Sequence, residues 1–259
     1  MYPQRRIALR LSYDGTGYHG WQKQPSVEQT IQGELERVLS ELLHAHIEVD
    51  GASRTDAGVH AEDQLCAFTM AHPIKLEGLI KALNRRLSPQ IAALSAHEVG
   101  PEFQPRFANH GKRYRYQIYH ATTRRPLLDR HSTWIHYPLC RERLIEGLAH
   151  LHGVHDFTSF AASNGQHQTA DREIWKTSLR CEMLSGGGML YVLHFSGDGF
   201  LKQMIRNMVG TLIEVGRKHW ESDRIPSIFE ARSRSAAGPT APARGLCLEE
   251  MFWSPERSS

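Results

Sequence analysis

The chain has 259 residues, of which 40% are hydrophobic and 23% are charged, with a formal net charge of +3. This composition predicts a folded globular protein and excludes a mainly disordered one. No stretch approaches the roughly 18 apolar residues of a membrane helix, and no apolar signal segment follows the basic start. The four cysteines lie far apart without a CxxC pair. That spacing argues against zinc and a disulfide framework, and it favours a reducing, cytoplasmic location.

The first hundred residues alternate between strand and helix patterns. Strands are expected in the apolar runs at 6–15, 47–50, 64–68 and 91–99. Amphipathic helices are expected at 26–45, starting with a capping box of Ser26 and Gln29, and at 74–87. The resulting βαββαβ order is that of the split ferredoxin-like arrangement, whereas a doubly wound fold would lack the adjacent strand pair.

The second half repeats this order with insertions. Strands are expected at 112–120, 172–184, 189–197 and 245–253, with three glycines making the turn of a hairpin after Ser185. Helices are expected at 141–153 and 200–217, and residues 155–171 read as an irregular excursion. We therefore predict two related α+β domains, comprising residues 1–105 and 106–259.

Two loops hold unusual residue combinations. GTGYHG (15–20) has the letters of a dinucleotide fingerprint, but the predicted helix starts too late to hold a pyrophosphate, so we interpret its glycines as permitting close approach of a backbone or ligand. GASRTDAGVHA (51–61) places Arg54 and Asp56 between glycines in a loop joining two strands. From the residues alone, Asp56 is either a turn-capping aspartate or a functional carboxylate.

Two segments of the second half combine cations with apolar or aromatic residues. KRYRYQIYH (112–120) puts Tyr114 and Tyr116 on one strand face, either to stack on a base or to fill the core. In FLKQMIRNMVG, Arg206 stands beside an apolar helical stripe, either as a solvated edge or as a partner for an anion. The histidines form no HExxH or compact His/Cys set, so no metal site is predicted.

Six segments together resemble the tRNA pseudouridine synthase A family. They are YDGTGYHGWQ, RTDAGVHA, KRYRY, HDFTSF, FLKQMIRNMVG and TAPARGL, and the similarity extends from near residue 7 to near residue 253. The resemblance implies an isomerase that converts uridine to pseudouridine at tRNA positions 38, 39 and 40, without a cofactor. It also implies two ferredoxin-like domains with joined antiparallel sheets, a basic cleft between them, and a homodimer that holds the tRNA anticodon arm.

The resemblance also assigns roles to individual residues. It implies that Asp56 is the catalytic aspartate, that Arg206 pairs with it, that Tyr114 stacks on the target uracil, and that Arg54 assists base flipping. Ser53 and Asp63 stand where the family commonly has glycine, and Asp63 is expected to weaken phosphate contact. The alternatives are a catalytically silent tRNA-binding protein and an oxidoreductase using the GTGYHG loop.

The modest net charge of the chain favours binding of tRNA, a large polyanion, by a homodimer of this protein. A +3 monomer has few basic clusters, whereas two copies double the basic surface. Candidate phosphate contacts are Arg85, Arg86, Arg113 and Arg115.

Overall fold

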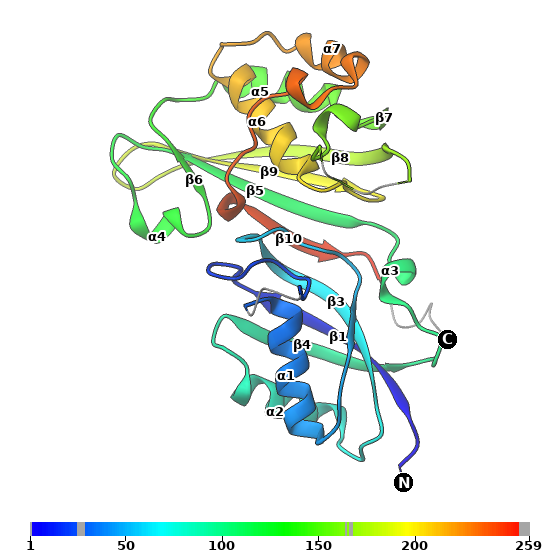
Figure 1. Cartoon of the computed structure of the whole chain (residues 1–259). Coiled ribbons are helices and arrows are strands. Elements are labelled where there is room, and N and C mark those ends of the chain that lie inside the picture. Colours follow the sequence, from blue (N-terminus) through cyan, green and yellow to red (C-terminus); the bar gives the residue numbers. More distant parts are fainter. Residues whose placement is uncertain (1, 25–28, 164, 166–167, 254–259) are drawn as a thin grey trace. The chain divides into compact units, whose positions relative to one another are not determined.

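The computed structural model of the chain describes residues 2–24, 29–163, 165 and 168–253. The protein is a mixed α+β structure whose strands pair mostly in antiparallel fashion (Figure 1). It divides into two compact units, Met1–His110 with Leu248–Ser259 and Gly111–Cys247. Strand β10 (Leu246–Met251) therefore starts in the second unit and ends in the first. Within the described residues, no helix is long and apolar enough to cross a membrane.

The first unit has the strand and helix order that its sequence predicts. Its elements are β1 (Arg5–Tyr13), α1 (Ile31–Leu43), β2 (Val49–Gly51), β3 (His60–Met70), α2 (Leu76–Arg86), β4 (Ile91–Val99) and the short α3 (Pro105–Ala108). Strand β1 lies between β3 and β4 and is antiparallel to both, while β2 pairs with β3. Ile7, Leu9 and Leu11 alternate along this strand and are fully buried, so the face that they share packs in the core of the unit.

Helix α1 begins at Ile31, later than the capping box at Ser26 and Gln29 predicts, and Ser26 itself lies outside the described residues. Thr30 is the N-cap, and its hydroxyl oxygen accepts a hydrogen bond from the amide of Gly33 at 3.1 Å. The amides of Ile31 and Gln32 donate to the carbonyls of Gly20 and Trp21. A helix start leaves amides without intrahelical acceptors, so these distant carbonyls stabilise the start at Ile31.

The second unit contains a four-stranded antiparallel sheet with helices. Its elements are β5 (Lys112–His120), α4 (Pro126–Asp129), β6 (Thr133–Ile135), α5 (Arg141–His150), β7 (Gly153–Asp156), β8 (Asp171–Met183), β9 (Met189–Gly197), α6 (Met204–Gly216) and α7 (Arg224–Ala231). The sheet order is β5-β9-β8-β7, and β6 runs parallel to β5. The predicted hairpin of β8 and β9 is confirmed, whereas β6, β7 and α7 are absent from the sequence prediction.

Two helix boundaries in this unit differ from the prediction. Helix α5 ends at His150 because Gly153 has a φ of +101° and starts β7. Helix α6 starts at Met204 after Gln203, which has a φ of +60° and interrupts the predicted run from residue 200. Almost every residue of α6 is buried, so this helix forms the core of its unit.

Candidate functional site

The RTDAGVHA loop between β2 and β3 is held by backbone contacts with residues 13–21. The amide of Trp21 donates to the carbonyl of Thr55 at 3.1 Å, and the amide of Gly58 donates to Tyr18 at 3.2 Å. The hydroxyl oxygens of Tyr13 and Thr55 lie 2.9 Å apart. Asp56 is half-buried between these attachment points, and its carbonyl accepts from the amide of Val59. The contacts on both sides of Asp56 restrain the backbone that carries its carboxylate.

Glycines in the GTGYHG segment permit this close packing. A Cβ on Gly15 would lie 2.1 Å from the carbonyl oxygen of Val59, and one on Gly20 would lie 2.5 Å from that of Thr55. The interpretation that these glycines let a backbone approach is thereby confirmed. The segment has no helix for a pyrophosphate, because residues 21–24 and 29–30 are not helical and α1 starts at Ile31. The dinucleotide alternative therefore lacks its structural context.

Substituting Gly15 tests whether this packing holds the Asp56 loop. We expect Gly15→Ala to lower the free energy of unfolding by about 1–3 kcal/mol, because the added Cβ meets the backbone of Val59. Gly100→Ala is the matched control, since no atom lies within 4 Å of a Cβ at that position. Chemical denaturation of both variants measures the difference, and equal stability would contradict the role of Gly15.

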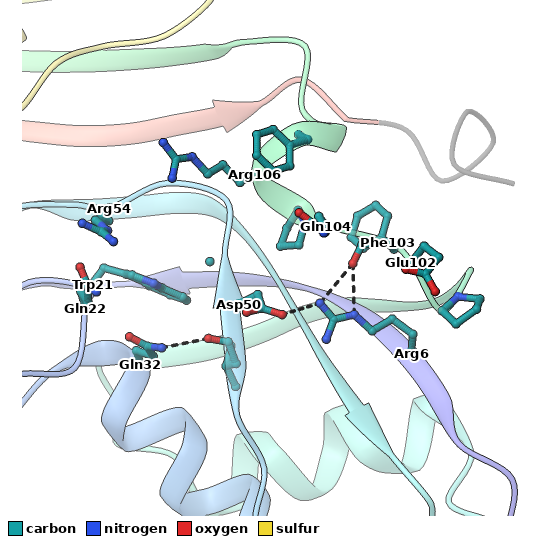
Figure 2. A pocket seen from close by; sticks show the side chains of 15 residues that line it. Arg6, Trp21, Gln22, Gln32, Asp50, Arg54, Glu102, Phe103, Gln104 and Arg106 are labelled. Carbon is teal, nitrogen blue, oxygen red and sulfur yellow. Dashed lines mark hydrogen bonds and ion pairs between the residues drawn. The ribbon is translucent and has the colours of Figure 1, made fainter. Parts of the chain in front are cut away.

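Arg54 lies on the same loop, two residues before Asp56, and its side chain is exposed. Among the described residues it makes no hydrogen bond or ion pair. Arg54 also lines a pocket of about 590 Å³ within the first unit, formed by residues of β1, β2 and the 101–107 segment (Figure 2). An exposed guanidinium without a carboxylate partner is available to a phosphate.

The two tyrosines of β5 differ in their surroundings. Tyr114 is 6% exposed, and its ring meets that of Phe200 edge-on with centroids 5.3 Å apart. Tyr116 is fully buried, its hydroxyl donates to the carbonyl of Pro242, and it also bonds to Thr133. Burial raises the pKa of the Tyr116 hydroxyl, so it stays protonated. Tyr116 is therefore a core residue, which is one of the two roles that the sequence allows for it.

Arg206 of α6 is bound to the TAPARGL segment. Its Nε donates to the carbonyl of Ala241 at 2.8 Å, and its own carbonyl accepts from the amide of Ala241. Its positive charge also lowers the pKa of Tyr116, in opposition to the larger effect of burial. Two motifs that the sequence analysis quoted separately, FLKQMIRNMVG and TAPARGL, are thus in contact through Arg206.

Asn207 is a buried polar residue of α6 that the sequence pattern did not single out. Its side chain is fully buried, donates to the carbonyl of Phe160 and accepts from the hydroxyl of Thr240 and the guanidinium of Arg234. It therefore joins HDFTSF to the segment that holds Arg206. An asparagine within an apolar helical stripe is the signal for such a role, because buried amides require partners.

Asp63, which is expected to weaken phosphate contact, has partners within the first unit. Its side chain is buried, accepts from Nη1 of Arg10 at 2.6 Å and accepts from the amide of Met251 at 3.1 Å. It joins β1, β3 and β10 within the first unit. Its carboxylate therefore forms an ion pair and a hydrogen bond within the first unit.

The expected site residues divide between the two units of the structure. Arg54 and Asp56 belong to one loop of the first unit, and Tyr114 and Arg206 belong to the second unit. Of the candidate phosphate contacts, Arg85 and Arg86 are exposed in the last turn of α2.

Comparison with known proteins gives one consistent family. The sequence pattern of the tRNA pseudouridine synthase family matches residues 11–108 and 148–254. A tRNA pseudouridine synthase A from Myxococcus xanthus is 42% identical over 249 residues, which cover 96% of this chain and 92% of the relative. Two further proteins named tRNA pseudouridine synthase A, from Moorella thermoacetica and Pelobacter propionicus, are 41% and 40% identical to this chain. The matched regions cover 95% and 96% of this chain, and 98% and 100% of the two relatives. The chain belongs to the tRNA pseudouridine synthase family.

Proposed function

We propose that the protein isomerises uridine to pseudouridine in tRNA, at positions 38, 39 and 40 of the anticodon stem and loop. The observation that carries this proposal is the identity of 42% to a tRNA pseudouridine synthase A over 96% of the chain. The specific positions rest on the resemblance of the six motifs. The firm attachment of the RTDAGVHA loop supports the proposal, because a reacting group needs a fixed position.

The reaction rearranges one nucleotide without adding or removing atoms. The bond from N1 of uracil to C1′ of ribose breaks, the base rotates, and C5 forms a new bond to C1′. The hydrogen on C5 leaves as a proton, and N1 gains one. The target base must first leave the stack, which costs a few kcal/mol.

Asp56 is the proposed catalytic residue. A carboxylate acts as a nucleophile at C6 or C1′, or as a base toward a ribose proton, and its negative charge also stabilises cationic character at C1′. Arg206 is the proposed cationic partner of this carboxylate, as the resemblance of FLKQMIRNMVG implies. Arg54 is proposed to assist base flipping, in line with its exposure and lack of a partner among the described residues.

Tyr114 is the proposed stacking residue for the target uracil. We expect Tyr114→Ala to lose about 1–3 kcal/mol of binding free energy for the substrate, because base–aromatic stacking contributes that amount. Tyr114→Phe keeps the ring and should keep affinity, and a slow rate in that variant would assign proton transfer to the hydroxyl. Equal affinity and rate in all three proteins would make Tyr114 a core residue only, and single-turnover kinetics with tRNA measures both quantities.

The remaining proposals concern architecture and assembly. We infer that both units are ferredoxin-like, a view supported in the first unit by the βαββαβ order with β1 between β3 and β4. The protein acts as a cytoplasmic homodimer, because two copies double the basic surface available to tRNA. Sedimentation at working concentration checks the dimer, and a fully active monomer would contradict it.

The test of the proposed function is incubation with uridine-labelled tRNA and no added cofactor, followed by nucleoside analysis. We expect pseudouridine to appear at positions 38 to 40. Binding of tRNA without any pseudouridine would instead support the catalytically silent binding protein.

A further inference from the structure

In the described part of the chain, the pocket in the first unit is lined partly by side chains that bond to other residues of the fold and partly by side chains that do not. It has a volume of about 590 Å³, within the range of ligand pockets. Arg6 serves the fold, since its guanidinium donates to the carboxylate of Asp50 at 2.5 Å and to the carbonyl of Phe103 (Figure 2). Gln32 is likewise engaged, because its side chain bonds to Lys23, Glu36 and Val49. These residues build the wall and leave other residues to bind a ligand.

Two cations of the pocket have no carboxylate partner. Arg54 and Arg106 are exposed and form no ion pair among the residues that the structure describes. Figure 2 shows Glu102 at the opposite end of the pocket from Arg54, and Asp50 is occupied by Arg6. Each of these two guanidinium groups therefore has the charge that suits a phosphate.

An aromatic ring lies beside Arg106. Phe107 is 76% exposed, and the guanidinium of Arg106 lies 5.9 Å from the centre of its ring. An exposed ring next to a guanidinium is the combination that binds single-stranded nucleic acid, where the ring stacks on a base and the cation holds the backbone.

Trp21 forms part of the pocket wall. It is 2% exposed, and its Nε1 lies 2.3 Å from where a Cβ on Gly51 would be. Its indole therefore packs closely against the backbone of β2.

We propose that this pocket binds one nucleotide of the RNA substrate other than the reacting uridine. The base stacks on Phe107, and Arg54 and Arg106 hold the phosphate. Arg54 connects the pocket to the reaction, because it is two residues from Asp56, at most about 7 Å of extended chain. The proposal rests on the proposed function for the identity of the RNA, and it adds a second contact that positions the tRNA on the first unit.

The test compares tRNA binding by variants of Phe107 and Arg106 with matched controls. Leu94→Ala removes another exposed apolar side chain of the first unit, and Lys81→Gln removes another exposed cation. We expect Phe107→Ala to weaken tRNA affinity by about 5- to 150-fold and Phe107→Trp to retain it, because stacking needs the ring. Arg106→Gln should reduce the slope of log affinity against log salt by about one. The single-turnover rate at saturating tRNA should change little in each variant.

Several outcomes would overturn the proposal. Phe107→Ala binding tRNA within twofold of Leu94→Ala would exclude stacking, and an unchanged salt slope in Arg106→Gln would exclude the phosphate contact. Uridine monophosphate titrated alone distinguishes the source of the ligand. Phe107-dependent binding of this mononucleotide with unchanged tRNA affinity would make the pocket a site for a free nucleotide.

The pocket and the proposed function fail separately. Wild-type protein that forms no pseudouridine, yet loses tRNA affinity on Phe107→Ala, would refute the function and retain the pocket. Wild-type protein that forms pseudouridine, with unchanged tRNA affinity in both pocket variants, would retain the function and refute the pocket.

Discussion

Replacing Asp56 by asparagine is expected to abolish pseudouridine formation while tRNA affinity stays within a few-fold of wild type. Asparagine has nearly the same shape but no negative charge, so it serves neither as a nucleophile nor as a base. The expected fall in rate is at least about 10²–10⁴-fold, the contribution of a single acid–base group. Affinity should persist because phosphate contacts elsewhere supply most of the binding of nucleic acids.

Single-turnover kinetics and filter binding with the same tRNA separate these two effects. Glu98→Gln is a suitable control, since it also removes one negative charge from the first unit, at an exposed ion pair with Arg5. The loop attachments through Thr55 and Gly58 do not involve the Asp56 side chain, and chemical denaturation of the variant checks that its fold is retained. Turnover by Asp56→Asn at a rate close to that of wild type would remove this residue from the catalytic role.

Replacing Arg206 by methionine should produce the second largest loss of rate. Removing one preorganised electrostatic contact in an active site lowers the rate by about 10²–10³-fold. Single-turnover kinetics at saturating tRNA measures this loss, and an unchanged rate would show that the proposed pair with Asp56 does not exist.

Arg206 also has a structural contact, so its variant needs a structural control. Arg206→Met loses the hydrogen bond from Nε to the carbonyl of Ala241, which costs about 0.5–1.5 kcal/mol of unfolding free energy. Arg217→Met removes an ion-paired arginine just after the same helix. A loss of rate in Arg206→Met alone, at comparable denaturation midpoints, assigns the effect to the charge at position 206.

Periodic patterns were sufficient to locate the longer strands and helices. Strands β4, β5 and β9 begin and end at the predicted residues. The reason is that the alternation of side chains between the two faces of a strand can be recognised from adjacent residues. The βαββαβ order of the first unit follows from the same local information. The short elements β6, β7 and α7 escaped because so few residues carry no distinct period, and their pairing depends on strands or helices far away in the chain.

The site shows the same division. The sequence by itself singled out the RTDAGVHA loop and gave Asp56, Arg54, Tyr114 and Arg206 their expected roles through resemblance. Only the tertiary structure decided that α1 starts at Ile31, because the acceptors for its first amides come from Gly20 and Trp21. It also decided that Asp63 is used by the fold and that Arg54 and Arg106 line one pocket. Ion pairs, burial and cavities depend on contacts between residues that are distant in sequence. A local sequence pattern contains no information about such contacts.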